Sequence, residues 1–164
     1  MEKFQSLREE ALKNYRMADH MLNVTYPLIQ DTKLLLGVTN NLFLALSHAL
    51  SSILHHERLF KLVPPFPDNF ESKFHLLHQK RSRYKINQEY FDLMLELKEI
   101  ILLHQNSPVE FRRKDRFIIC TKNYKVKAIT SNQLKNYLKK TREFLDLMNQ
   151  ITSRNQRLFQ NFNP

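Results

Sequence analysis

The sequence predicts a mainly α-helical fold, an antiparallel bundle of four to five helices with one β-hairpin. Apolar residues recur every three to four positions over most of the 164 residues, which is the spacing of one helix face. The chain has a single glycine, the residue that turn-rich β folds use for positive φ. Hydrophobic residues make up 42% of the chain, enough for a packed core. The length fits one helical domain over residues 1–164.

Five segments have helical spacing and are predicted as helices: residues 6–25, 31–61, 69–83, 87–106 and 131–153. Ser6 and Glu9 have the spacing of a capping box at the start of the first helix. We expect this helix to end before Pro27, because proline disfavours the α conformation of the residue before it. Gly37 lies inside the second helix and indicates either a close helix contact or a break into two helices.

Proline and capping residues mark the later helix boundaries. The run Pro64–Pro67 favours an extended connection. We expect Asp68 or Asn69 to cap the third helix. Asn87 is the predicted cap of the fourth helix, and Ser131 is that of the last.

Between the fourth and last helices the period changes to that of a strand. Arg116–Thr121 and Tyr124–Ile129 are rich in β-branched residues, and the second alternates apolar with basic side chains. We predict a hairpin over residues 116–129 with a turn at residues 122–123. This hairpin must pack on the helices, because an isolated one is only marginally stable. Cys120 is expected to be a buried and inert residue of this apolar strand.

The formal net charge is +10, and the excess lies in the second half of the chain. Residues 1–79 hold 8 Lys and Arg against 8 Asp and Glu, whereas residues 80–164 hold 18 against 8. Segment 110–142 alone has eleven basic and two acidic residues. Such a concentration of positive charge attracts polyanions, of which nucleic acid is the commonest. A solvated surface, or lysines that protect an exposed sheet edge, would have the same composition.

The predicted binding surface for RNA or another polyanion lies on the hairpin and the last helix. Because alternate side chains of a strand point to opposite faces, we expect Lys125 and Lys127 to form one basic stripe. Tyr124 or Phe111 is available to stack on bases. The proposed polyanion-binding residues are Arg112, Arg113, Lys114, Arg116, Lys125, Lys127, Lys135, Lys139 and Arg142.

The sequence lacks the motifs of several catalytic and metal sites. One cysteine allows no disulfide within the chain and no zinc site built from cysteine pairs. A single glycine excludes the P-loop and dinucleotide-binding loops. The seven histidines include no Glu-x-x-His and no His-Glu-x-x-His motif, so we expect no metal and no other cofactor. We expect His48 on a polar helix face or hydrogen-bonded in the core, and His55, His56 and His78 at the surface.

Neither a membrane span nor a secretion signal is predicted. No run approaches the ~18 consecutive apolar residues of a membrane-spanning helix. The first residues lack the apolar core of a signal peptide. We therefore expect a cytoplasmic protein in a reducing compartment, without a membrane partner.

Two helical patterns also carry a family resemblance. They are Ala11-x-x-x-Tyr15-x-x-Ala18-Asp19 and Phe43-x-Ala45-x-x-His48-Ala49-x-x-Ser52-Ile53-Leu54, followed by a proline-containing turn and a third helix. Over residues 6–106 this order resembles the HEPN superfamily of small helical nucleotide- and RNA-associated domains. Residues 62–74 and 107–117 also look like an archaeal protein family that has no assigned activity. The HEPN resemblance implies an up-and-down bundle and a homodimer, with contacts through the apolar surfaces of the second and fourth helices.

The resemblance favours a non-catalytic binding or regulatory module over an enzyme. Catalytic HEPN members are metal-independent ribonucleases with an arginine followed, after four to six residues, by a histidine. This chain lacks that pair, since Arg16 and His20 have only three residues between them. One open alternative is an atypical ribonuclease that uses His48, His20 or Arg16. The other is a protein-interaction partner in a toxin–antitoxin-like system, with contacts from the Pro64–Phe70 loop.

Overall fold

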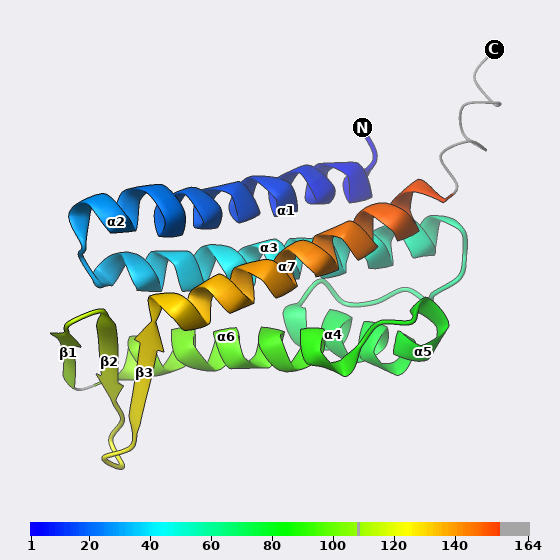
Figure 1. Ribbon diagram of the computed structural model, residues 1–164. Coiled ribbons are helices and arrows are strands. Elements are labelled where there is room, and N and C mark those ends of the chain that lie inside the picture. Colours follow the sequence, from blue (N-terminus) through cyan, green and yellow to red (C-terminus); the bar gives the residue numbers. More distant parts are fainter. Residues whose placement is uncertain (108, 155–164) are drawn as a thin grey trace.

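The structure, a computed structural model, describes residues 1–107 and 109–154. It is mainly helical, with a small antiparallel sheet at one end of the packed helices (Figure 1). This confirms the prediction that the fold is mainly α-helical. The elements in chain order are α1 Lys3–His20, the π-helical turn η1 Met21–Thr25, α2 Tyr26–Ile29, α3 Lys33–Leu59, α4 Phe70–Gln79, α5 Arg81–Tyr84, α6 Gln88–Asn106, β1 Val109–Arg113, β2 Arg116–Cys120, β3 Val126–Thr130 and α7 Ser131–Ser153.

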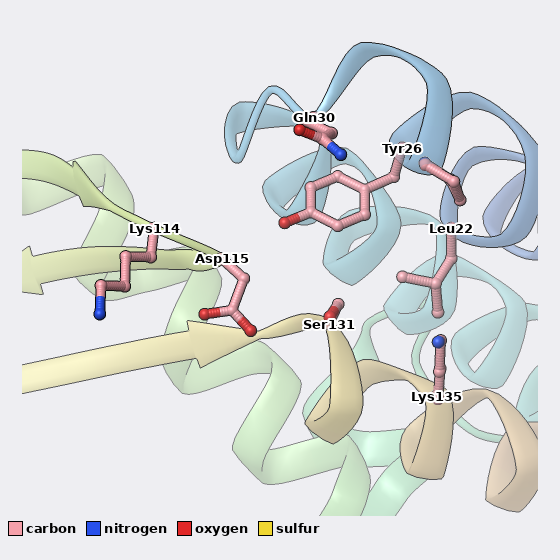
Figure 2. Close-up of a pocket in the computed structure, with 8 residues that line it drawn as sticks. Leu22, Tyr26, Gln30, Lys114, Asp115, Ser131 and Lys135 are labelled. Atoms are coloured by element: carbon pink, nitrogen blue, oxygen red, sulfur yellow. The ribbon is translucent and has the colours of Figure 1, made fainter.

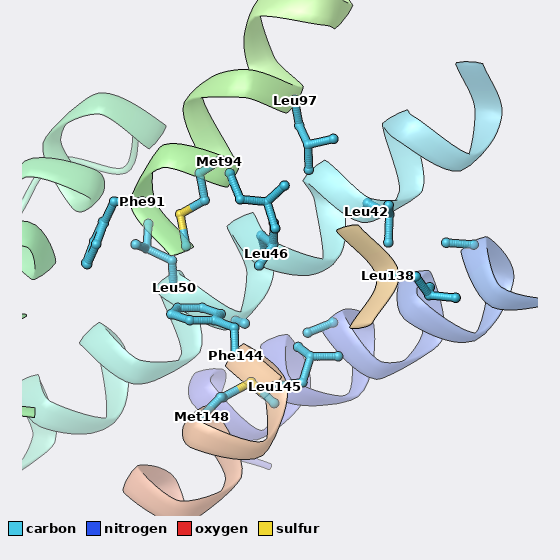
Figure 3. Close-up of a cluster of buried hydrophobic side chains, with 14 of the residues drawn as sticks. Leu42, Leu46, Leu50, Phe91, Met94, Leu97, Leu138, Phe144, Leu145 and Met148 are labelled. Atoms are coloured by element: carbon cyan, nitrogen blue, oxygen red, sulfur yellow. The ribbon is translucent and has the colours of Figure 1, made fainter. Parts of the chain in front are cut away.

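The long helix α3 holds the helices together, since it contacts α1, α6 and α7. In Figure 1 it runs between α1 and α6, and α1 begins at the end of the molecule opposite the sheet. Leu42, Leu46 and Leu50 follow one another at intervals of four residues on one side of α3, and all three are fully buried. Burying each such side chain contributes about 1.5–3 kcal/mol. Figure 3 shows them among buried side chains of α6 and α7: Phe91, Met94, Leu97, Leu138, Phe144, Leu145 and Met148.

By length and composition alone, α3 is also apolar enough to cross a membrane. The sequence prediction missed this property because Ser47 and His48 interrupt its longest apolar run. In the structure, 56% of the most apolar 18-residue stretch of α3 is buried against the rest of the chain. A core helix has the same character.

The prediction that the first helix ends before Pro27 is wrong. The π-helical turn η1 follows α1, and the helix continues through α2 to Ile29. In this turn the Tyr26 N–H donates to the Met21 carbonyl, five residues earlier. Proline lacks an N–H, and its ring clashes with the carbonyl four residues before it in a regular α-helix. The wider π turn accommodates Pro27 without a break, and Gln30, with φ of 56°, ends the helix.

Gly37 permits a close contact between this turn and α3, which is unbroken. A Cβ at Gly37 would collide with the Met21 methyl group. Of the two predicted alternatives for Gly37, the close helix contact is therefore correct.

Asparagine residues cap two helices as predicted. Asn69 Oδ1 accepts a hydrogen bond from the Ser72 N–H at 2.8 Å, at the start of α4. Asn87 Oδ1 accepts one from the Glu89 N–H at 3.2 Å, at the start of α6. The predicted third helix is divided at Lys80 into α4 and α5.

The predicted caps of the first and last helices are wrong. Thr130 caps α7, because its Oγ1 accepts from the Gln133 N–H at 3.2 Å, and Ser131 is already helical. Ser6 and Glu9 lie inside α1, which begins at Lys3. Sequence signals place helix starts only to within a few residues when neighbouring residues also suit a cap.

The sheet contains the predicted hairpin, β2 and β3, and a third strand, β1, that was not predicted. The strand order is β1-β2-β3, and both pairs are antiparallel. Two turns depend on positive φ at residues other than glycine, Lys114 at 54° and Tyr124 at 60°. The Tyr124 N–H donates to the Thr121 carbonyl at 3.0 Å within the loop between β2 and β3. The scarcity of glycine therefore does not prevent tight β-turns in this chain.

His56 is buried, contrary to the prediction that it lies at the surface, and His55 and His78 are half-buried. Glu57, only 4% exposed, accepts a hydrogen bond from the Tyr84 hydroxyl at 2.5 Å. Nδ1 of His56 lies 3.0 Å from Oε1 of Glu57. Burial acts to raise the pKa of Glu57, but the hydrogen bonds with His56 and Tyr84 outweigh it and lower that pKa.

Candidate nucleic-acid interface

The sheet has one face against the helices and one face toward solvent. Phe117, Ile119 and Ile129 are buried and belong to the core, so their side of the strands is the inner face. Because side chains alternate along a strand, the residues between them lie on the opposite side. In register, this outer sheet face consists of Val109, Phe111, Arg113, Arg116, Ile118, Cys120, Val126, Ala128 and Thr130.

Apolar side chains are exposed on the outer sheet face. Phe111 is 43% exposed and Val126 is 64% exposed. Phe111 lies opposite Ile118, which lies opposite Ala128. Ile118 is only 7% exposed and Ala128 is half-buried, so the exposed apolar side chains of this face lie on the outer strands β1 and β3. Cys120, expected to be buried, is half-buried on this face. An exposed apolar patch on a folded domain commonly marks an interaction site.

The loop between β2 and β3 presents an aromatic side chain to solvent. Tyr124 is 94% exposed. Lys122 and Lys125, in the same loop, are exposed as well. The Lys125 N–H donates to Thr121 Oγ1 at 3.1 Å, which helps to hold the loop closed.

Three of the nine predicted cations already have carboxylate partners. Arg112 pairs with Asp31 at 3.0 Å, and Arg142 pairs with Asp146 at 3.5 Å. Lys127 forms an ion pair with Glu96. Burial acts to lower the pKa of Lys127, but the hydrogen bond with Glu96 and the negative charges of Glu96 and Glu99 together raise that pKa.

The predicted stripe of Lys125 and Lys127 is wrong. Lys127 shares the inner face with Ile129, two residues along β3, and reaches Glu96 on α6. Lys125 precedes β3 and lies in the loop. Only Lys127 is therefore in a strand, and its ammonium group is paired with Glu96.

The other predicted cations are exposed at the sheet and along α7. Arg113 and Arg116 lie directly opposite each other at the end of the β1–β2 pair, on the outer sheet face. Like charges in such positions repel. Within residues 1–107 and 109–154, neither guanidinium forms an ion pair. A bound anion would relieve this repulsion. The rest of this set is Lys114 in the β1–β2 turn, Lys125 in the next loop, and Lys135 and Lys139 on α7.

A cleft of about 440 Å³ adjoins the β1–β2 turn. Its lining comes from η1, α2, the turn and the first residues of α7: Leu22, Tyr26, Pro27, Gln30, Lys114, Asp115, Ser131 and Lys135. Figure 2 shows the Tyr26 ring between Gln30 and Leu22, with the Asp115 carboxylate and Ser131 across the opening. Burial and the nearby Asp115 carboxylate raise the pKa of Tyr26, so its hydroxyl remains protonated and can donate. No sequence pattern marks Tyr26 or Asp115 as a site residue.

The residues of the alternative ribonuclease hypothesis lie on α1 and α3. Arg16 and His20 are exposed, and the His20 ring is 3.4 Å from the Thr25 hydroxyl. His48 is half-buried, and burial lowers its pKa. In the part of the chain that the structure describes, no group of three or more His, Cys, Asp or Glu side chains is arranged to hold a metal ion.

Comparisons with protein-family models, with curated proteins and with solved structures found no match to this chain. The resemblance to HEPN domains therefore remains a prediction from the sequence.

Proposed function

We propose that the protein is a non-catalytic module that binds single-stranded RNA on its outer sheet face. The observation that carries this proposal is an exposed aromatic residue of the outer sheet face, Phe111, beside the exposed Arg113 and Arg116. Stacking of a base on an aromatic side chain is worth about 1–3 kcal/mol. Arginine and lysine side chains hold the phosphates between stacked bases.

Charge favours a polyanion over a second copy of this chain. The outer sheet face and its two connecting loops carry one carboxylate, Asp115. They carry five cationic side chains: Arg113, Lys114, Arg116, Lys122 and Lys125. A second positively charged chain would be repelled here, whereas a phosphate backbone would be attracted.

A single strand suits this surface better than a duplex. Phe111 and Tyr124 can stack only on bases that are free of their neighbours in a helix. Tyr124 extends the row of exposed side chains beyond β2 and β3. Loops and unpaired ends of RNA are therefore the expected ligands.

The test compares cationic side chains on the outer sheet face with cationic side chains on its inner face. Binding of a fluorescein-labelled oligouridylate is followed by fluorescence anisotropy at several salt concentrations. We expect the variants Arg113→Gln and Arg116→Gln to bind more weakly and to reduce the salt slope by about 0.7 for each phosphate that is no longer neutralised. Arg112→Gln and Lys127→Gln serve as matched controls. Their side chains already have carboxylate partners, so their replacement should change binding little.

Two results would contradict the proposal. One is unchanged binding by the double variant that combines Arg113→Gln with Arg116→Gln. The other is an equal weakening of RNA binding by the variants of the outer face and by those of the inner face. That result would indicate that RNA is attracted by net charge alone. Circular dichroism spectra would establish that each variant is folded.

The two alternatives from the sequence predict other outcomes. Metal-independent cleavage of the RNA that disappears in His48→Ala would favour the atypical ribonuclease. Co-purification of a polypeptide without nucleic acid would favour a protein partner.

We also propose that the packed helices form a HEPN-like up-and-down bundle that pairs as a homodimer. The exposed Leu95 and Leu102, seven residues apart on one side of α6, support a contact through that helix. A mass in solution equal to that of the monomer would refute the dimer.

A further inference from the structure

The cleft meets the sheet at the β1–β2 turn, next to the outer sheet face. Lys114 and Asp115 form the turn, and both line the cleft. Arg113 and Arg116, on either side of them in the chain, belong to the outer sheet face. An RNA strand that crosses this face toward the turn would therefore reach the cleft.

The size and walls of the cleft suit one nucleotide. Its volume of about 440 Å³ lies within the range of roughly 300–1,000 Å³ that is usual for small-ligand pockets. Tyr26 and Pro27 provide an apolar wall, and Lys135 provides a cation on the first turns of α7. Figure 2 shows the Lys135 amine and the Asp115 carboxylate on different sides of the opening.

The carboxylate of Asp115 indicates which part of a nucleotide it would contact. A carboxylate repels phosphate but accepts hydrogen bonds from hydroxyl groups. The ribose 2′-hydroxyl is such a donor, and it is the group by which a protein distinguishes RNA from DNA. The outer sheet face offers only stacking and phosphate contacts, which DNA would satisfy equally well.

We propose that this cleft takes one ribonucleotide and selects RNA over DNA, with Asp115 accepting from the 2′-hydroxyl, Tyr26 against the base and Lys135 on the phosphate. The inference rests on the proposed function, since the outer sheet face brings the strand to the cleft. Asp115 lies in an exposed turn, so its replacement leaves the core unchanged.

The experiment measures binding of an oligouridylate and of an oligodeoxyuridylate of equal length to the full chain. These strands differ only in the 2′-hydroxyl. We expect the wild-type protein to prefer RNA about tenfold, the value of one hydrogen bond to a charged group. Asp115→Ala should remove this preference by weakening RNA binding, while DNA binding stays equal or becomes tighter.

Two control variants distinguish this effect from others. Lys135→Gln should weaken binding of both strands equally, because both carry phosphates. Asp92→Ala, which removes an exposed carboxylate on α6, should leave the preference unchanged.

Equal binding of the two strands by the wild-type protein would overturn the inference and leave the proposed function standing. A preference for RNA that survives in Asp115→Ala would overturn it as well. Binding of neither strand would overturn the proposed function, and this inference with it.

Discussion

Replacing Tyr124 with glycine should stabilise the fold and weaken RNA binding. Tyr124 has φ of 60°, in the left-handed region that costs a residue with a side chain about 1–2 kcal/mol. Glycine avoids this cost, but it has greater conformational freedom in the unfolded chain. That freedom reduces the gain in stability by about 0.5–1 kcal/mol. Because Tyr124 is 94% exposed, its side chain contributes little burial energy. We therefore expect a net gain of about 0.5–1 kcal/mol.

The same change should weaken RNA binding about five- to hundredfold, since one stacked base is worth about 1–3 kcal/mol. Urea unfolding and fluorescence anisotropy measure the two effects. Lys85→Gly is the matched control, because Lys85 has φ of 55° beside α5, at the end of the molecule opposite the sheet (Figure 1). It should gain stability without weakening RNA binding. Tighter or unchanged binding by Tyr124→Gly would refute a stacking role for Tyr124.

The remaining predictions concern ionisable groups that are buried or half-buried. Tyr84→Phe removes a hydrogen bond to buried Glu57 and should lower the free energy of unfolding by about 2 kcal/mol. Thermal unfolding measures this loss, and an unchanged unfolding midpoint would contradict it. Because the pKa of folded Glu57 is lowered, its stabilisation is present above about pH 4.5 and is lost as the pH falls through the folded value. The difference in stability between wild type and Glu57→Gln should therefore shrink in acid. Burial and nearby cations lower the pKa of His55 to about 4, so its NMR titration midpoint should lie near pH 4, and a midpoint near 6.5 would refute this. The neutral form is favoured in the fold, so the His55 contribution to stability falls as the pH drops from about 6.5 toward 4.

Local patterns predicted the helices well because their apolar spacing is regular. The final helix has the predicted bounds, Ser131–Ser153. Strand β1 was not predicted because Val109–Arg113 lies in a charged stretch without a clear strand pattern. It is a strand because it pairs with β2 in the fold. The π turn that accommodates Pro27 was missed for a similar reason, since it depends on contacts that follow the fold, such as that of Met21 with Gly37.

The candidate site was predicted only in part, because charge composition does not specify where side chains point. Arg112 and Arg113 are neighbours in the sequence, yet they lie on opposite faces of β1. Arg112 finds its carboxylate partner far away in the chain, at Asp31. Likewise, the cleft brings Tyr26 beside Asp115, and neither residue has a local signal that marks it.

The most direct test of RNA binding on the outer sheet face is an NMR titration of the ¹⁵N-labelled protein with a short oligouridylate. We expect the largest shifts at the backbone amides of β1, β2, β3 and the loop that contains Tyr124, with α4 and α5 unaffected. Shifts confined to α4 and α5, or small shifts scattered over every helix, would contradict the account.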